Sequence, residues 1–326
     1  MKVCVFGAGA TGGHFAGMLS RAGHEVSVVV RGANLQAIRD NGLQLLTDDG
    51  PVVAMVKASD DARELGPQDV VLVSLKSHAL PQAADGIAAL LGPGTPVVFL
   101  QNGIPWWYYH GLGGDQGGRR LPRIDPGDAL WNAVGPQRAI GGITSSACTV
   151  VAPGVVEVKG GNRPLVLGEP DGSDSARLRT VAAMFREAGF PAETTPAIRD
   201  AIWTKLTLNI GSGPLGVLVP MPVRDLCAQG PMLEARLRNQ EEAMATARAM
   251  GCHVDPAFIT AQLELARRSP HVPSIAQDAA AGRRMELETM FLAPLQMARE
   301  KGVPTPTLDL LVGLCVMKAK AAGLYP

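Results

Sequence analysis

The amino-acid sequence predicts an α/β fold in its N-terminal part, followed by an all-helical C-terminal part. Residues 2–6 are an apolar, β-branched run that ends at a glycine, and helical spacing of apolar residues begins directly after it. Runs at 25–30, 69–76 and 96–102 are largely apolar, as expected for parallel strands buried on both faces. From residue 197 onward the spacing is helical, without another extended run. We therefore expect two domains, residues 1–196 and 197–326.

A glycine-rich turn joins the first strand to the first helix. Its sequence is Gly7-Ala8-Gly9-Ala10-Thr11-Gly12, which matches G-x-G-x-x-G. In this context Gly7 permits the tight turn, Gly9 lets a pyrophosphate approach the backbone, and Gly12 lets the helix pack close to the strand. The free N–H groups and the positive dipole end of the helix then face the phosphates. The turn predicts a dinucleotide site in a Rossmann-type domain.

The ends of the following strands indicate which dinucleotide binds. The second strand ends in Arg31, where an acidic residue would accept a hydrogen bond from the ribose 2′-hydroxyl of NAD. A guanidinium instead binds a phosphate through charge-assisted hydrogen bonds, so we expect NADP(H) over NAD(H). The alternative is a solvated arginine. Lys76 and Asn102 follow two further strands, and because ligands lie beyond strand carboxyl ends, both are expected to reach cofactor or substrate.

Residues 104–138 are rich in aromatic side chains, including Trp106, Trp107 and Trp131. A long connection of this kind is usually functional or disordered, and the aromatic content argues against disorder. Three interpretations stay open: a lid over the active cleft, a subunit contact, or core packing. Together with the apolar helices, the segment favours a homodimer. Strand-like runs precede it at 43–47 and 52–57, as a hairpin, and follow it at 139–150, 155–159 and 164–168.

Two stretches of the helical half carry candidate catalytic groups. Lys205 and Asn209 are four residues apart and share one face of a helix. Burial among apolar neighbours would lower the pKa of Lys205 and make it a proton donor near neutral pH, although an exposed lysine on an amphipathic helix is the alternative. Ser274 and Gln277 match a capping box, which gives Ser274 a structural role. Glu286 is expected on the following helix, by default as a solvated carboxylate.

Composition excludes several functional classes. Lysine and arginine number 30, as do aspartate and glutamate, so net charge gives no reason to expect nucleic acid or an anionic membrane as partner. No apolar run has the roughly 18–20 residues of a membrane span. The five scattered cysteines contain no C-x-x-C and indicate reduced thiols in a cytoplasmic protein without a secretory signal. We expect no metal, because cysteine and histidine lack ligand spacing.

Taken together, these motifs resemble the ketopantoate reductase (2-dehydropantoate 2-reductase) family over essentially the whole chain. The matching pieces are the glycine turn with Arg31, the strand ending at Lys76, Gln101-Asn102-Gly103, Ile202-Trp-Thr-Lys-Leu-Thr-Leu-Asn209, and Ser274-Ile-Ala-Gln-Asp278 with Glu286. The resemblance implies a Rossmann domain, a helical domain and a cleft between them. It also implies NADPH-dependent reduction of ketopantoate to pantoate, in the route to pantothenate and coenzyme A.

The resemblance also implies roles for single residues. Lys205 matches the catalytic lysine that polarises the C2 carbonyl and supplies a proton as hydride arrives, and Glu286 matches the acid that orients it. The remaining matches are cofactor contacts at residues 7–12, Arg31, Lys76 and Asn102, and groups for the substrate's carboxylate and hydroxyls at Asn102, Asn209 and Ser274.

The sequence departs from the family pattern on the substrate side. The pattern has a second asparagine where this chain has Gly213, so one substrate donor is missing unless Ser212 replaces it. The segment 104–138 is also longer than the family's connection. Three functions therefore stay open. They are reduction of ketopantoate, reduction of a bulkier or more apolar carbonyl acid by the same chemistry, and NADP binding without catalysis, which an intact Lys205 and Glu286 disfavour.

Overall fold

The computed structural model describes residues 1–228 and 230–325. The chain divides into two compact units. The α/β unit comprises Met1–Gln101 and Pro105–Ile198, and the helical unit comprises Asn102–Ile104 and Arg199–Pro326. An α/β unit followed by a helical one is the fold class that the sequence predicts. Three residues from the first half of the chain, 102–104, belong to the helical unit, and the site described below depends on them.

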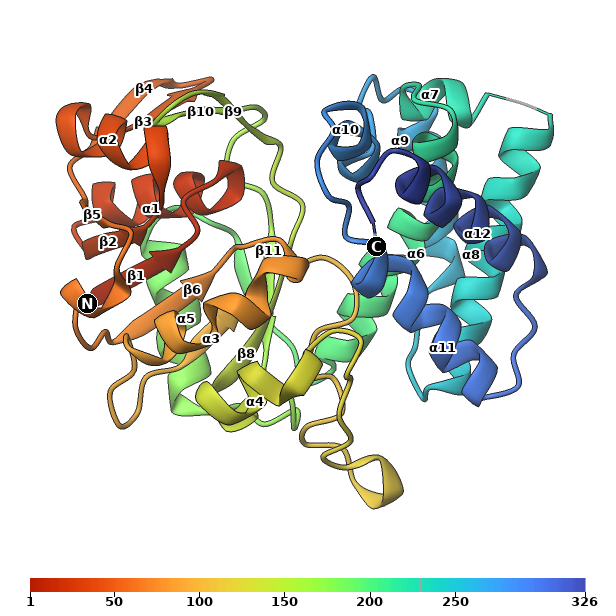
Figure 1. Ribbon diagram of the computed structural model, residues 1–326, viewed down its shortest axis with the longest axis horizontal. Helices are drawn as coiled ribbons and strands as arrows, with labels where there is room; N and C mark the ends of the chain where they lie inside the picture. Colours follow the sequence, from red (N-terminus) through yellow and green to blue (C-terminus); the bar gives the residue numbers. More distant parts are fainter. Residues whose placement is uncertain (229, 326) are drawn as a thin grey trace. The chain divides into compact units, whose positions relative to one another are not determined.

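A mixed eight-stranded sheet forms the centre of the α/β unit (Figure 1). Its order is β12-β11-β8-β7-β6-β1-β2-β5, and every pair is parallel except β11 with β8. The strands are β1 (Lys2–Phe6), β2 (Glu25–Val29), β5 (Lys57–Ser59), β6 (Val70–Val73), β7 (Val97–Phe99), β8 (Ala139–Thr144), β11 (Leu165–Gly168) and β12 (Ala192–Thr194). The strand order reverses between β1 and β6, the position at which open α/β sheets bind ligands.

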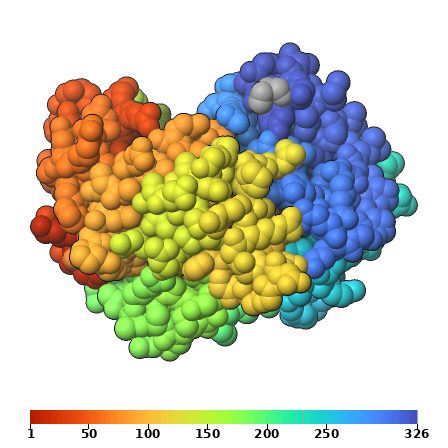
Figure 2. Space-filling view, turned by 60° about the horizontal axis from the view of Figure 1, so that its bottom comes forward, coloured from red at the N-terminus to blue at the C-terminus, as the bar shows by residue number. Residues whose placement is uncertain are grey.

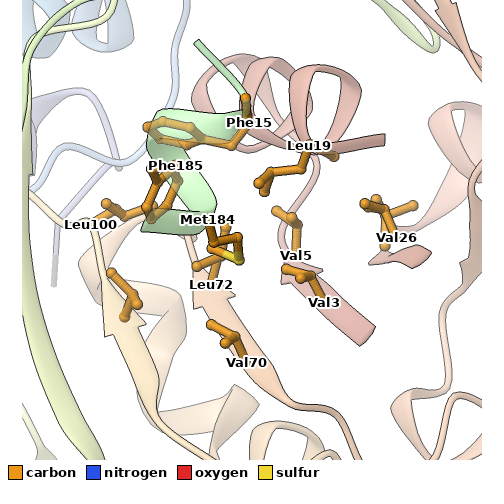
Figure 3. Close-up of a cluster of buried hydrophobic side chains, with 14 of the residues drawn as sticks. Val3, Val5, Phe15, Leu19, Val26, Val70, Leu72, Leu100, Met184 and Phe185 are labelled. Carbon is orange, nitrogen blue, oxygen red and sulfur yellow. The ribbon is translucent and has the colours of Figure 1, made fainter. Parts of the chain in front are cut away.

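Helices cover both faces of this sheet. Helices α1 (Ala10–Arg21) and α5 (Ala176–Glu187) pack against each other on one face. Helices α3 (Leu80–Ala88) and α4 (Ala129–Ala133) form a second contacting pair. Phe15 of α1 and Phe185 of α5 meet edge to face, with ring centroids 5.2 Å apart. Beneath them lie valines and leucines of β1 and β6 (Figure 3). On the other side of β1, Phe6 contacts α3 at Gly86. The sheet is therefore buried on both faces, as its continuous apolar strands predict.

A second, four-stranded sheet has the order β4-β3-β10-β9. The predicted hairpin is confirmed as β3 (Leu43–Thr47) and β4 (Gly50–Ala54), which pair antiparallel. The strand-like run 139–150 is split, because only its first part is β8, and the chain then leaves the main sheet. Strands β9 (Cys148–Ala152) and β10 (Val155–Val158) join the hairpin instead, with β10 parallel to β3. Local alternation could not predict this long-range partner.

Shorter elements complete the α/β unit. They are α2 (Gly32–Asn41), η1 (Ala62–Glu64), η2 (Ser77–Ala79), η3 (Gly114–Gln116), η4 (Pro126–Asp128) and η5 (Pro136–Arg138). The helix α2 is not predicted by the sequence, since it opens with Gly32 and contains Asn34, which are weak helix formers.

The aromatic segment after residue 104 packs largely into the core. Trp106, Trp107, Tyr108 and Tyr109 are each at most 1% exposed. The Trp107 ring closes on the backbone at Gly141 of β8, where an added Cβ would lie 2.9 Å from the indole. Core packing is thus the correct interpretation for these four side chains. Most residues of the following stretch, 111–123, are exposed, and the space-filling view shows it at the surface in gold and yellow (Figure 2).

The helical unit is an array of helices in which the described residues from 199 onward form no strand. They are α6 (Ile198–Leu218), α7 (Val223–Leu226), α8 (Pro231–Ala249), α9 (Pro256–Ala266), α10 (Ser274–Ala280), the π-helix η6 (Glu288–Leu292), α11 (Ala293–Glu300) and α12 (Pro306–Ala321). Pro214 lies inside α6 and cannot donate to the carbonyl of Ile210. The Asn239 amide of α8 donates to that carbonyl instead, at 3.4 Å, so α6 continues past the proline.

Three further properties concern the whole described chain. Among residues 1–228 and 230–325, no helix is both long and apolar enough to cross a membrane. All five cysteines are free thiols, and four of them are buried. The same ranges contain no group of three or more His, Cys, Asp or Glu placed to hold a metal ion.

Candidate functional site

The glycine turn of the α/β unit has the geometry that its sequence predicts. Gly7 adopts a φ of +99°, which favours glycine. A Cβ on Gly12 would lie 2.1 Å from the Gly7 carbonyl oxygen and 2.2 Å from Oγ of Ser74, so no larger residue fits between helix and strand. A Cβ on Gly9 would meet nothing within 4 Å. The turn is therefore closed at Gly7 and Gly12 and open at Gly9, the position at which a phosphate would approach.

The N-terminus of the helix that follows, α1, is suited to binding an anion. Its N-cap is Gly9, no side chain caps it, and its first turn has no acidic residue. The first N–H groups of a helix lack intrahelical acceptors and carry partial positive charge, which suits a phosphate. Arg31 is exposed at the end of β2, and Lys76 is exposed after β6. Residues 7–12 with these two cations can hold a dinucleotide that carries an additional phosphate.

Lys205 lies on α6 and is the candidate proton donor. Its side chain is partly buried, and this burial lowers the pKa of Lys205 from 10.5 to about 8. The negative charge of Glu286 opposes that shift by raising the pKa, but burial has the larger effect. The prediction of a lowered pKa is confirmed. A lysine with a pKa of about 8 is mostly protonated at neutral pH and still gives up its proton readily.

Glu286 is not on a helix, contrary to the sequence-based expectation. Helix α10 ends at Ala280, and Gly282 turns the chain with a φ of +64°. The chain is then non-helical up to Glu286, which directly precedes the helical turn that enters η6. The expectation of a solvated carboxylate is also wrong, because Glu286 is 4% exposed. A buried carboxylate whose charge acts on Lys205 is suited to holding that lysine in position.

The segment 102–104 is fixed to the same part of the helical unit. The backbone N–H of Ile104 donates to the carbonyl of Thr289, at 2.9 Å. Gly103 has a φ of +84°, and a Cβ there would lie 2.4 Å from the Thr289 carbonyl group. Only glycine tolerates this contact, which explains why Asn102 is followed by glycine. The segment carries the half-buried Asn102 to the π-helix that starts two residues after Glu286.

Ser274 does not form the predicted capping box. It is the first residue of α10 rather than its N-cap, which is Pro273, and no side chain caps the helix. The Gln277 side chain instead donates to the carbonyl of Val272, at 2.8 Å. Ser274 is exposed, and its hydroxyl does not cap the helix. The next residue, Ile275, packs 3.6 Å from where a Cβ of Gly213 would be, which sets α10 against α6.

The predicted site residues therefore fall into two sets. Residues 7–12, Arg31 and Lys76 lie in the α/β unit, whereas Asn102, Lys205, Asn209, Ser274 and Glu286 lie in the helical unit. Sequence reasoning missed the π-helix η6 and its Phe291, which packs against Gly213. No sequence signal marks a π-turn, although such turns occur frequently at functional sites. The only available signal was Gly213 itself, where a side chain was expected.

Comparison with known proteins identifies the family of this chain. The model of the family "Ketopantoate reductase PanE/ApbA" matches residues 3–113, and the model of its C-terminal part matches residues 197–319. The chain belongs to the ketopantoate reductase family. This membership confirms the predicted enzyme class, an NADP-dependent oxidoreductase, and the predicted fold class.

Individual relatives of this family are similar over their full length. A 2-dehydropantoate 2-reductase of Mesorhizobium japonicum is 40% identical over 327 aligned residues, which cover 100% of both chains. A crystal structure from Ralstonia solanacearum MolK2 has a TM-score of 0.91 at 36% identity and covers 99% of both chains. The PanE/ApbA family ketopantoate reductase from Ralstonia eutropha JMP134 has a TM-score of 0.85 at 28% identity, with 99% and 100% of the chains covered.

Proposed function

We propose that this chain reduces 2-dehydropantoate (ketopantoate) to pantoate with NADPH, in the cytoplasm, as a step toward pantothenate. The observation that carries the proposal is Lys205, whose pKa is lowered to about 8 by burial, with the charge of the buried Glu286 acting on it, in a member of this family. A proton donor of this kind is what reduction of a carbonyl requires.

The α/β unit holds the cofactor in this proposal. The backbone of residues 7–12 and the N-terminus of α1 bind the pyrophosphate, because their N–H groups have no acceptor within the helix. Arg31 binds the 2′-phosphate, and Lys76 adds a second positive charge near the switch point between β1 and β6. When bound, NADPH supplies the hydride. The absence of a carboxylate at the end of β2 supports NADPH over NADH.

The helical unit supplies the acid. As the C2 carbon accepts hydride, its oxygen gains negative charge, and Nζ of Lys205 donates a proton that makes the product hydroxyl. The ammonium stabilises this oxygen most in the transition state, where the charge develops, so the interaction raises the rate as well as the affinity. Glu286 positions the ammonium. Asn102, Asn209 and Ser274 hold the carboxylate and hydroxyl of the substrate.

Purified protein tests the proposal through the oxidation of NADPH in the presence of ketopantoate. We expect turnover with NADPH that exceeds turnover with NADH by about tenfold or more, since a bidentate phosphate contact is lost with NADH. If the protein binds NADPH but does not oxidise it with ketopantoate or with any other 2-oxo acid, the proposal is refuted. The protein would then bind NADP(H) without catalysing a reaction. A gel-filtration measurement in the same preparation tests the expected homodimer.

A second candidate is a more apolar 2-oxo acid as the substrate. The observation that favours it is Gly213, four residues beyond Asn209 on the same face of α6. The chemistry of Lys205 is unchanged in this alternative, and a panel of 2-oxo acids separates the two candidates.

A further inference from the structure

Helix α12 is apolar on more sides than its own unit covers. From Leu308 to Met317, every residue except Asp309 is apolar or a glycine. One face of the helix is buried, since Val312 and Cys315 are each at most 1% exposed, and α12 packs beside α8 (Figure 1). A helix that is apolar all round is normally buried on all sides. The face of α12 that points away from the unit therefore has the sequence of a contact surface.

This outer face carries a continuous line of exposed apolar side chains, which we call the α12 stripe. Leu310, Leu314 and Met317 are 63%, 47% and 66% exposed. Their spacings of four and three residues place them on one face of the helix. Gly313 lies beside Leu314 in the stripe, and a Cβ there would meet no atom of the described residues within 4 Å. Single exposed apolar residues are ordinary on a protein surface, whereas a contiguous set marks an interaction site.

The α12 stripe is complementary to itself when two copies run in opposite directions. Its centre lies between Gly313 and Leu314, so a two-fold axis there places Leu310 of each copy opposite Met317 of the other. Leu314 then lies beside its own copy across the axis, and Gly313 lets the two backbones approach closely. A two-fold interface requires that one patch match itself in this way.

The charges beside the stripe favour the same direction. Asp309 and Lys320 are eleven residues apart, about three helical turns, so they lie on the same flank near opposite ends of the stripe. Antiparallel pairing places Asp309 of each copy beside Lys320 of the other, whereas parallel pairing would bring like charges together. Asp309 also binds Arg299 of its own chain, but 37% of its side chain stays exposed, and a carboxylate can accept from both cations.

We propose that two copies of this chain form a two-fold dimer through the α12 stripe, with their α12 helices antiparallel. Burial of the stripe supplies the favourable free energy, and the charged flanks set the direction. The side chains of residues 106–109 do not supply this contact, because each is at most 1% exposed within its own chain. The inference concerns assembly and does not depend on the proposed reductase activity.

Sedimentation velocity of the full chain tests the proposal, at protein concentrations from about 1 to about 100 µM. The wild type should be a dimer over the upper part of this range. Leu314→Glu should raise the dissociation constant of the dimer by at least about 30-fold, because two carboxylates then meet at the two-fold axis. A wild type that stays monomeric throughout would overturn the proposal, as would a Leu314→Glu variant that dimerises as tightly as the wild type.

A pair of introduced charges tests the direction of the helices. Leu310→Lys and Met317→Glu should each raise the dissociation constant by at least about tenfold, since a charge then replaces an apolar contact. The double variant should dimerise at least about tenfold more tightly than either single variant, because antiparallel pairing sets each new lysine against a new glutamate, and salt should weaken this recovery. A double variant weaker than both single variants would contradict the antiparallel arrangement.

Leu265→Lys is the matched control. Leu265 lies on α9 and is as exposed as Leu310, at 63%. The dissociation constant of this variant should stay within about twofold of the wild-type value, because the side chain lies outside the stripe. If Leu265→Lys weakens the dimer as much as Leu310→Lys does, the contact is not at the α12 stripe. Circular dichroism should show the wild-type helix content in all these variants, since the substituted side chains are exposed.

Discussion

The lowered pKa of Lys205 predicts a specific pH dependence for the reduction. The protonated lysine is the donor, so activity is present below its pKa and is lost as pH rises through it. With a pKa of about 8, Lys205 is protonated in about nine-tenths of molecules at pH 7 and in about one-tenth at pH 9. An ordinary lysine of pKa 10.5 would still be almost fully protonated at pH 9. The reduction rate should therefore fall about tenfold per pH unit above pH 8.

The assay is kcat/KM for the 2-oxo acid at saturating NADPH, measured from about pH 6 to about pH 10. The reverse reaction, oxidation of the hydroxy acid, needs the neutral amine and should rise over the same range. In Glu286→Gln the opposing charge is removed, so the pKa of Lys205 falls further and the midpoint moves to lower pH. A midpoint near 10.5, or the same midpoint in the wild type and in Glu286→Gln, would refute the reasoning.

Three further predictions concern the cofactor and the core. Gly12→Ala should lower the melting temperature, measured by calorimetry, because its Cβ collides with the Gly7 carbonyl. Gly9→Ala should keep the wild-type melting temperature, since Gly9 is open, but should weaken NADPH binding, measured by fluorescence titration. Arg31→Ala should lower the ratio of kcat/KM with NADPH to kcat/KM with NADH by about tenfold or more. An unchanged ratio would exclude Arg31 as the residue that contacts the 2′-phosphate. Trp107→Ala should lower the free energy of unfolding by about 3–5 kcal/mol in urea, because the ring is fully buried, and a loss below about 1 kcal/mol would contradict its core role.

The sequence predicts those parts of the fold that local chemistry determines. Apolar runs identify the strands of the main sheet, and helical spacing identifies α6 with Lys205 and Asn209 on one face. The glycine turn is predictable because Gly7 and Gly12 meet steric demands that only glycine satisfies. These features depend on residues near one another in the chain, so no knowledge of distant partners is needed.

The errors arise where a distant contact, or a turn without a clear sequence signal, overrides the local pattern. Strand β10 pairs with β3, more than 100 residues away in the chain, and β9 joins the same sheet through β10; local alternation cannot encode that choice. Helix α10 ends early because Arg283 folds back to Asp278, with its backbone N–H 2.8 Å from the Asp278 carbonyl oxygen and its Nε 3.0 Å from the carboxylate. Glu286 is consequently buried before a π-helix instead of solvated on an α-helix.

The role of Lys205 is the central claim, and one variant tests it most directly. Ketopantoate-dependent oxidation of NADPH by Lys205→Ala should be slower than that of the wild type by about 100-fold to 10,000-fold, the usual contribution of a general acid. The dissociation constant for NADPH should change by no more than about twofold, because the proposed cofactor contacts lie in the α/β unit. A Lys205→Ala variant within about threefold of the wild-type rate would contradict the account.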